Sequence, residues 1–347
     1  MESAGVVRHR QVGGRRSRPD PKFYAGSGKV EEIHAAADEL NAAFIVFNHE
    51  LSPAQQRNIE KQVQRRVLDR TEVILEIFAQ RAQTAEGKVQ VELARLEHLS
   101  TRLIRGWSHL ERQRGGFGRT GGPGEKQLEL DRRYIGTKVK TLKGKLQQLQ
   151  KQRAVQSRAR ARGEVLSVSL VGYTNAGKST LFNALAHAKA YEADQLFATL
   201  DTTTRRAWIA GAGNITVSDT VGFIRELPHN LVAAFRATLE ETVHADLLLH
   251  VVDASSPARD AQAQAVNEVL AEIPAGEAPQ LVVCNKIDLA GLEPRVERDQ
   301  YGRISRVFVS ARTGAGMEEL RGAISEFAQA RKANAVGAPE THSLQPH

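Results

Sequence analysis

The stretch Gly172-Tyr173-Thr174-Asn175-Ala176-Gly177-Lys178-Ser179 decides the fold class of this chain. It follows an apolar run over 165–171, which predicts a buried strand, and it opens a segment that is predicted to be helical. In that context, glycine, four variable residues and Gly-Lys-Ser predict a phosphate-binding loop. Backbone N–H groups over 175–180 are expected to surround phosphates at the helix N-terminus, with Lys178 bridging the outer phosphates.

Further strands are predicted to alternate with helices after this loop. Their expected ranges are 207–210, 215–219, 247–253, 281–284 and 307–310. This alternation predicts an α/β fold, a P-loop domain with a mostly parallel sheet and helices on both faces.

Oxygen-bearing residues at two strand ends predict a magnesium site. The Ser179 hydroxyl is expected to ligate Mg²⁺, and Asp219 is expected to hold the ion through water. The N–H of Gly222, in Asp219-Thr220-Val221-Gly222, is expected to contact the terminal phosphate. A switch segment must add one threonine hydroxyl. Four threonines stand there, and the residues alone do not choose among Thr199, Thr202, Thr203 and Thr204.

Two later segments predict recognition of guanine. Asp288, in Asn285-Lys286-Ile287-Asp288, can accept two hydrogen bonds from guanine, a pair of donors that adenine lacks. Asn285 is expected to fix the loop, the Lys286 stem to cover the base, and the Ala311 N–H of Ser310-Ala311 to meet the base oxygen. The predicted substrate is therefore GTP, with GDP as product.

Phe223 follows Gly222, at the position where many GTPases carry a glutamine that orients the attacking water. A phenylalanine cannot polarise water, so slow hydrolysis is predicted for the isolated protein. Its ring could be core packing or a retracted hydrophobic switch. Asn175 could help to bind K⁺, as an Asn at this position does in potassium-using GTPases, or could merely shape the loop.

The bulk composition restricts the class of protein. A length of 347 residues indicates about two domains, and 41% hydrophobic with 25% charged residues is typical of a soluble globular protein. No apolar run reaches the roughly 18 residues of a membrane span, and the basic N-terminus lacks the apolar core of a signal peptide. The single Cys284 excludes a disulfide framework and favours the reducing cytoplasm.

The upstream half divides into predicted parts that precede a GTPase domain over 163–331. Residues 1–22 are predicted to be a basic flexible arm, and 23–70 a small α/β subdomain with helices over 30–43 and 53–64 and strands over 44–47 and 66–69. Residues 71–162 are predicted to form a long antiparallel helical hairpin with a glycine-rich loop over 114–124. A disordered tail is expected over 332–347.

The hairpin helices carry apolar residues at helical spacing and most of the excess charge. One predicted stripe comprises Leu93, Leu96, Leu99, Leu103, Trp107 and Leu110. The second helix, over 125–162, has a near-heptad seam in which Gly136 and Gly144 could cause a kink. This helix holds 12 Lys and Arg and three acids, a net charge of +9 against +8 for the whole chain. A solvated face is the simple explanation, whereas a one-sided run of this size favours a polyanionic partner.

With both halves considered, the chain resembles the HflX family of ribosome-associated GTPases over roughly 19–330. The upstream segments that carry the resemblance are Gly26-Ser27-Gly28-Lys29-Val30, Leu51-Ser52-Pro53-Ala54-Gln55-Gln56-Arg57-Asn58, Asp69-Arg70-Thr71, Gly115-Gly116-Phe117-Gly118 and Gly121-Gly122-Pro123-Gly124-Glu125. The P-loop and Phe197-Ala198-Thr199-Leu200-Asp201 resemble the family signature downstream.

The resemblance implies a function beyond the nucleotide site. It makes Thr199 the switch ligand of Mg²⁺, and it implies binding to the large ribosomal subunit, with the hairpin and its loop reaching ribosomal RNA. It also implies splitting or rescue of stalled ribosomes under stress, with hydrolysis stimulated by the ribosome. Some members are credited with ATP-dependent RNA remodelling, although no second phosphate loop is present. A monomer is expected for the free protein.

Several positions depart from the family pattern. The strand and helix that usually precede the segment 18–30 are expected to be missing, as is a further C-terminal domain. Thr202 replaces a common proline, and Lys126 replaces a threonine.

The expected functional residues form three overlapping sets. The catalytic set is Lys178, Asn175, Thr199 and Gly222. The nucleotide-binding set is Gly172, Tyr173, Thr174, Asn175, Ala176, Gly177, Lys178, Ser179, Thr180, Phe197, Ala198, Thr199, Leu200, Asp201, Asp219, Thr220, Val221, Gly222, Asn285, Lys286, Ile287, Asp288, Ser310, Ala311 and Arg312, with Ser179, Thr199 and Asp219 as metal ligands. The RNA-binding set is Arg114, Arg119, Lys126, Arg132 and Arg133. An RNA-binding factor that nucleotide only regulates is the alternative function.

Overall fold

A computed structural model describes residues 9–113, 123–161, 165–186, 197, 199–200, 202–224, 243–272 and 278–336. Backbone contacts divide the chain into two compact units, with the boundary at Arg153 and Ala154 inside a long helix. Within the described ranges, no helix is both long and apolar enough to cross a membrane.

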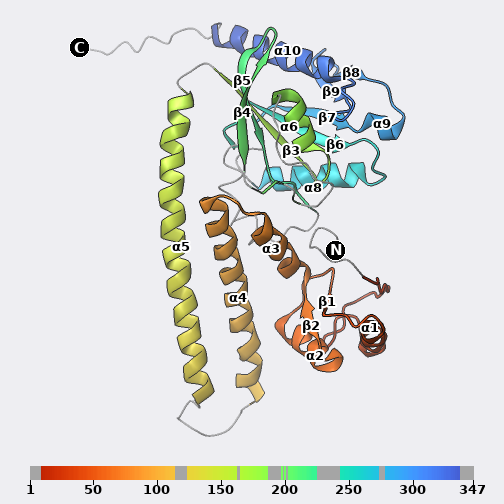
Figure 1. Cartoon of the computed structure of the whole chain (residues 1–347), viewed down its shortest axis with the longest axis vertical. Helices are drawn as coiled ribbons and strands as arrows, with labels where there is room; N and C mark the ends of the chain where they lie inside the picture. Colours follow the sequence, from red (N-terminus) through yellow and green to blue (C-terminus); the bar gives the residue numbers. More distant parts are fainter. Residues whose placement is uncertain are drawn as a thin grey trace, which may run out of the picture. The chain divides into compact units, whose positions relative to one another are not determined.

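The first unit is a small α/β subdomain followed by long helices (Figure 1). Its elements are α1 (Ser27–Glu39), β1 (Phe44–Val46), α2 (Pro53–Val63), β2 (Arg66–Leu68), α3 (Arg70–Arg81), α4 (Ala85–Gln113) and α5 (Pro123–Ala161). Strands β1 and β2 pair in parallel, with Ile45 opposite Val67. Capping boxes of Ser52 with Gln55 and of Asp69 with Glu72 begin α2 and α3.

The prediction of two hairpin helices was wrong in one respect, because the stretch 71–113 forms two helices rather than one. The chain turns to an extended conformation at Ala82, with φ −64° and ψ 112°. Thr84 then starts α4, since its hydroxyl accepts a hydrogen bond from the Gly87 N–H at 2.9 Å. A side-chain cap overrides the continuous apolar periodicity here.

The seam between α4 and α5 is built from a few apolar residues. Val89, Leu93 and Leu142 are buried together, and Leu96, Val139 and Leu146 pack against them. Two ion pairs flank the seam, Lys138–Glu92 at 2.9 Å and Lys143–Glu97 at 2.8 Å. Leu99 is 47% exposed, so its predicted place in the stripe was wrong. Helix α5 continues through Gly136 and Gly144.

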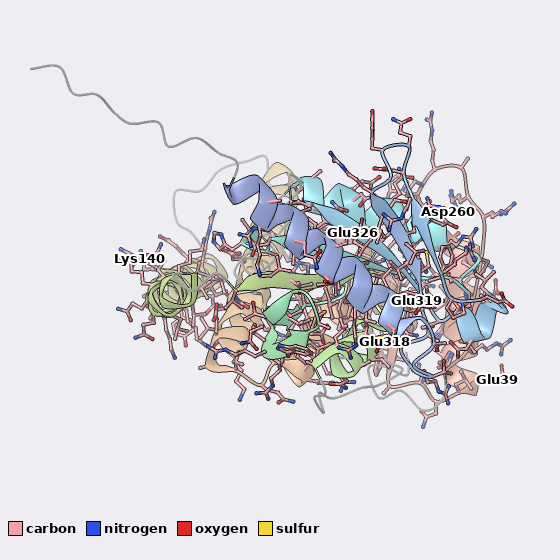
Figure 2. All side chains as sticks on the ribbon, turned by 90° about the horizontal axis from the view of Figure 1, so that it is seen from above. Glu39, Lys140, Asp260, Glu318, Glu319 and Glu326 are labelled. Carbon is pink, nitrogen blue, oxygen red and sulfur yellow. The ribbon has the colours of Figure 1, made fainter. Side chains whose placement is uncertain are left out.

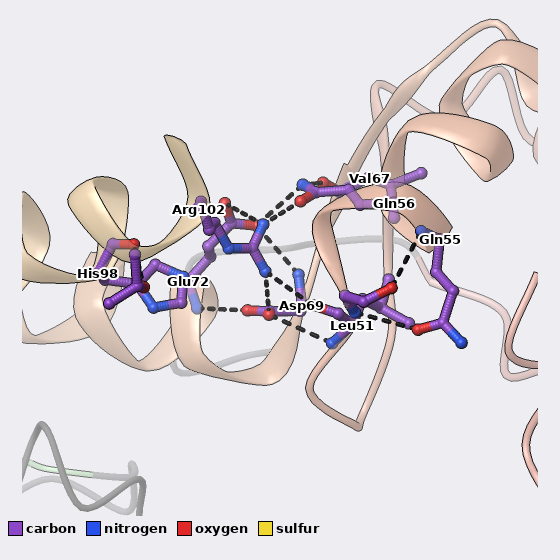
Figure 3. A network of polar contacts seen from close by, with 10 residues as sticks. Leu51, Gln55, Gln56, Val67, Asp69, Glu72, His98 and Arg102 are labelled. Carbon is purple, nitrogen blue, oxygen red and sulfur yellow. Dashed lines mark hydrogen bonds and ion pairs between the residues drawn. The ribbon is translucent and has the colours of Figure 1, made fainter. Parts of the chain in front are cut away.

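A polar network attaches α4 to the subdomain (Figure 3). The Arg102 guanidinium pairs with Asp69, which is fully buried, and with Glu72 at 3.2 Å. It also donates to Gln56 Oε1 and to the Leu51 carbonyl. Burial of Glu72 raises its pKa, although the charge of Arg102 opposes that shift. One arginine on α4 therefore holds three segments of the subdomain.

The second unit contains a seven-stranded sheet in the order β4-β5-β3-β6-β7-β9-β8. Its elements are β3 (Leu166–Gly172), α6 (Lys178–Ala186), β4 (Thr203–Ile209), β5 (Gly213–Asp219), β6 (Leu247–Asp253), α8 (Arg259–Ala271), β7 (Gln280–Asn285), α9 (Ile287–Ala290), β8 (Arg295–Arg298), β9 (Ile304–Phe308) and α10 (Met317–Val336). The five central strands are parallel, and the edge strands β4 and β8 are antiparallel to their neighbours.

Helices cover both faces of this sheet, which confirms the predicted fold class. Helices α6 and α10 share one core with the strands, in which Leu181 and Ile324 are fully buried. Helix α8 contacts β3 and β6, and its buried Val266 does not belong to that core, so α8 covers the opposite face.

Several elements differ from the sequence-based expectations, among them α1, which was expected over 30–43 and spans Ser27–Glu39. Strand β4 begins at Thr203, before the apolar residues that indicated a strand, because its pairing with β5 starts at Thr203 opposite Asp219. Strand β8 was not predicted, since Arg295–Arg298 is a charged edge strand. Helix α10 continues to Val336, beyond the point where the tail was expected to begin.

Candidate functional site

The predicted phosphate loop connects β3 to α6 in the conformation that a Gly-Lys-Ser loop requires. Asn175 and Gly177 have positive φ angles of 62° and 90°. A Cβ atom on Gly177 would lie 2.2 Å from Nδ2 of Asn285, so only glycine fits there. The Lys178 ammonium is directed back over the loop, where it donates to the carbonyls of Gly172 at 3.2 Å and Tyr173 at 3.0 Å.

Burial controls the electrostatics around Lys178. Loss of water lowers the pKa of Lys178 to about 8, although the nearby charge of Asp219 opposes that shift. Burial likewise raises the pKa of Asp219, against the opposing charge of Lys178. His250 on β6 is 3% exposed, and burial together with Lys178 lowers its pKa to about 4. The histidine is therefore neutral beside the loop.

The three predicted magnesium ligands meet in one cluster, although they come from three segments of the chain. Ser179 Oγ lies 2.7 Å from Asp219 Oδ2 and 2.8 Å from Thr199 Oγ1. Thr199 Oγ1 in turn donates to Asp219 Oδ2 at 2.8 Å. The second oxygen of Asp219 is buried and has no hydrogen-bond partner among the described residues. Two hydroxyls and a carboxylate with an unused oxygen form a donor set that suits a hard cation such as Mg²⁺.

The predicted guanine loop is tied to the phosphate loop through Asn285. Its side-chain amide donates to the Ala176 carbonyl at 3.0 Å, and its oxygen accepts the Ala311 N–H at 3.0 Å. The N–H that was expected to meet the base is thus bonded to Asn285 in this structure. Asp288 is exposed in the first turn of α9, and Ser310 is fully buried.

An ion pair that sequence reasoning missed holds the lysine of this loop. Lys286 has a left-handed φ of 64°, and its ammonium lies 2.8 Å from Asp253 Oδ2. Asp253 ends β6 opposite Asn285 in the parallel register, and Ser255 donates two hydrogen bonds to its other oxygen. The sequence held one signal for this pair, because β6 ends in an acidic residue and lies next to β7, the strand that leads into Asn-Lys-x-Asp.

Phe223 is part of the packed interior, and its backbone pairs with the phosphate loop. Its ring is 1% exposed. Its carbonyl accepts from the Thr174 N–H at 2.7 Å, and its own N–H donates to the Gly172 carbonyl at 3.1 Å. The pairing brings Gly222 against the loop, where an added Cβ would lie 2.8 Å from Thr174 Cα and 2.9 Å from Lys178 Nζ. Asp219–Gly222 and the P-loop are therefore in direct contact.

The remaining nucleotide-site candidates fall around the same loops. Thr180 lies in the first turn of α6, Ile287 begins α9, and Arg312 is exposed after Ala311. Phe197 and Leu200 are each 3% exposed, on either side of Thr199. Ala198 and Asp201 lie outside the described residues.

The predicted RNA-binding residues are only partly described. Arg114 and Arg119 lie outside the described residues, and Lys126 falls on α5. Arg132 and Arg133 are exposed on α5, where Arg133 lies 3.4 Å from Glu129. Lys140 is also exposed on this helix and points away from it (Figure 2).

Comparison with known proteins gives matches over both units. Three family models match: GTP-binding GTPase N-terminal over residues 1–79, GTP-binding GTPase Middle Region over 81–160, and 50S ribosome-binding GTPase over 167–286. GTPase HflX of Escherichia coli K12 is 53% identical over 327 residues, which cover 94% of this chain and 76% of that protein. GTPase HflX of Magnetococcus marinus is 51% identical over 300 residues, which cover 86% and 69%.

A solved structure is also similar to the chain. It is a GTP-binding protein from Sulfolobus solfataricus in complex with GDP, with 25% identity and a TM-score of 0.47 over 91% of this chain and 89% of that one.

Proposed function

Since the chain belongs to the HflX family of GTPases, we propose that it couples GTP hydrolysis to the large ribosomal subunit, splitting or rescuing stalled ribosomes under stress. Two features support this proposal. The family matched by the GTPase domain is described as 50S ribosome-binding. Helix α5 also presents exposed cationic residues, among them Arg132 and Lys140, which suit RNA phosphates.

One observation carries the nucleotide switch: Ser179, Thr199 and Asp219 converge within 2.8 Å of one another. These residues would hold Mg²⁺, which in GTPases neutralises charge on the outer phosphates. Lys178 would donate to the same phosphates, and the Gly222 N–H would contact the terminal one. Thr199 is the ligand that would engage only when the terminal phosphate is present, and so it would report which nucleotide is bound.

Co-sedimentation with large ribosomal subunits tests the switch. We expect strong binding with a non-hydrolysable GTP analogue, and weaker binding with GDP or without nucleotide. Thr199→Ala should remove this difference, whereas Thr202→Ala, a matched loss of a threonine from the same segment, should keep it. Equal binding of the unaltered protein in all three conditions would exclude the switch mechanism.

A nucleotide-regulated RNA-binding factor with little turnover is the second candidate. The observation that favours it is Phe223, whose buried ring and two backbone bonds leave no polar group where a water-orienting side chain is expected. GTP turnover with and without large subunits discriminates the two functions, since absence of stimulation supports the binding factor. ATP-driven RNA remodelling predicts an activity that survives Asp288→Asn, which should abolish recognition of guanine.

Asn175 supports a role for K⁺, because it is exposed on the phosphate loop with a left-handed backbone. We expect faster steady-state GTP hydrolysis in potassium than in sodium, and Asn175→Ala should remove the difference. Equal rates in the two salts would leave Asn175 with a loop-shaping role alone.

A further inference from the structure

The edge strand β4 exposes a tryptophan on its outer face. Trp208 is 67% exposed, whereas its neighbours Ala207 and Ile209 are 7% and 1% exposed. Tryptophan is highly buried on average, so an exposure of 67% is unusual for this residue type. Because successive side chains of a strand point to opposite faces, Trp208 shares its face with Arg206 and not with the core. β4 lies at the end of the sheet, beside β5 alone (Figure 1).

The surroundings of Trp208 are polar and cationic. In the antiparallel register Trp208 lies opposite Asn214, and Arg206 lies opposite Thr216. From Thr203 to Ser218 the hairpin contains two arginines and no acid. Both arginines, Arg205 and Arg206, are exposed, and neither forms an ion pair within the described part of the chain. The hairpin thus combines a flat aromatic surface with uncompensated positive charge.

We propose that the outer face of the β4–β5 hairpin, formed by Arg206, Trp208, Asn214 and Thr216, binds single-stranded RNA. The exposed indole offers a surface on which an unpaired base can stack. The Arg206 guanidinium, two residues away on the same face, can pair with the adjoining phosphate. Asn214 supplies polar groups for a base edge or a ribose hydroxyl. The Thr216 hydroxyl donates to the Leu166 carbonyl at 3.5 Å, and its oxygen can still accept a hydrogen bond. Between Thr203 and Ser218 the hairpin carries positive charge and no acidic residue, and the acid that ends β5, Asp219, is fully buried in the magnesium cluster. The exposed face therefore suits a polyanion better than a basic protein surface.

This surface is distinct from the basic helix α5, because β4 and β5 belong to the GTPase unit. It therefore predicts that the GTPase unit contacts RNA through its own residues. The RNA-binding hairpin is tested with a short RNA, whereas the proposed function is tested with ribosomal subunits. Failure of either proposal therefore does not decide the other.

Tryptophan fluorescence gives a local readout in the full chain. The sequence contains two tryptophans, Trp107 and Trp208, so Trp107→Phe leaves Trp208 as the only reporter. Titration with an unstructured RNA of about 12 nucleotides should quench Trp208 as the base stacks, and the effect should weaken as salt rises. An unchanged Trp208 signal, while anisotropy of labelled RNA shows saturated binding, would overturn the proposal.

Affinity measurements on substituted full-length chains provide the second readout. Trp208→Ala should weaken RNA binding by about 5- to 150-fold, the range that corresponds to loss of one stacked base. Trp208→Phe should retain most of the affinity. The matched control is Tyr301→Ala, which removes another exposed aromatic (75% exposed) in the turn between β8 and β9, at the opposite edge of the sheet.

Two results would contradict the RNA surface. One is equal RNA affinity for Trp208→Ala and Tyr301→Ala, with GDP binding of both variants showing that they fold. The other is a self-association that depends on Trp208 and is unaffected by RNA, which would assign the face to a second copy of the chain.

Discussion

At the scale of single residues, the ion pair between Asp253 and Lys286 adds a residue from outside the Asn-Lys-x-Asp motif to the loop that is predicted to read guanine. Burial opposes ionisation of Asp253, but the hydrogen bonds from Lys286 and Ser255 prevail and lower its pKa. Lys286 has a left-handed backbone, and its ammonium lies 2.8 Å from the carboxylate. Asp253 therefore acts as a positioning residue for the lysine stem that would cover the base.

We predict that Asp253→Asn weakens the affinity for GDP and for GTP by roughly tenfold each, since a hydrogen bond to a charged group is lost. Competition with a fluorescent guanine nucleotide measures both affinities. Lys286→Met in the Asp253→Asn background should add little to the loss. The control is Asp260→Asn, which removes a fully solvated carboxylate (97% exposed). Additive losses in the double variant would show that the two residues act independently.

Lys178 predicts how nucleotide affinity depends on pH. Its pKa is lowered to about 8 by burial, and bound phosphates should raise it, because they favour the charged form. Below pH 8 the Lys178 ammonium is charged with or without nucleotide, so this group makes no contribution to the pH dependence of GDP affinity there. Above pH 8 the free protein loses the proton and binding must take one up, so the affinity for GDP falls by up to about tenfold per pH unit.

Calorimetry at pH 8.5 in buffers of different ionisation enthalpy measures that proton uptake. We expect uptake at pH 8.5 that vanishes at pH 7. Lys178→Arg keeps its charge across this range, so the variant should show no uptake from this group at either pH. Equal uptake by the unaltered protein at pH 7 and 8.5 would assign the proton to another group.

At the scale of secondary-structure elements, the Arg102 network determines how α4 is attached to the subdomain. Arg102→Met leaves Asp69 fully buried without its cation, and removing one partner of a buried pair costs about 3–5 kcal/mol of folding free energy. Arg95→Met is the matched control on the same helix, because the Arg95–Glu76 pair is largely exposed and should contribute under about 1 kcal/mol. Denaturant unfolding measures both variants; equal losses would mean that the network adds no stability.

The same elements show what the sequence could predict. Strands β3 and β6 were predictable, because each is a short and mainly apolar segment, although polar residues stand within it (Ser167 and Ser169 in β3, His250 in β6). The break between α3 and α4 was not, because the apolar spacing continues across Ala82 while the Thr84 hydroxyl starts a new helix. Strand β8 was missed since its residues are charged, and only pairing with β9 defines it.

The residues of the candidate site could be predicted where they lie within one continuous motif. Contacts between residues that are distant in the sequence were harder to predict. The P-loop and the strand end at Asp219 were readable from local spacing. The residues alone left four threonines open, and the structure places the Thr199 hydroxyl on Asp219. The backbone pairing of Phe223 with Gly172 and Thr174 could not be read from spacing, because it depends on how two loops meet. The Asp253–Lys286 pair had one signal, the acidic residue that ends β6, but using it requires knowing that β6 and β7 are neighbours in the sheet.

At the scale of the whole molecule, the two compact units predict two separable unfolding events, although α5 contributes residues to both. A ligand that binds only the folded form stabilises the unit that contains its site, by about 2.7 kcal/mol at 100 times its Kd. GDP with Mg²⁺ should therefore raise the unfolding temperature of the GTPase unit and leave the other transition where it was. Arg102→Met should lower the other transition alone, because its contacts lie within the first unit.

Differential scanning calorimetry measures both effects in the same chain. The contrary result is a single transition that shifts both with nucleotide and with Arg102→Met. The two units would then unfold together, because the coupling free energy through α5 would exceed the difference between their free energies of unfolding.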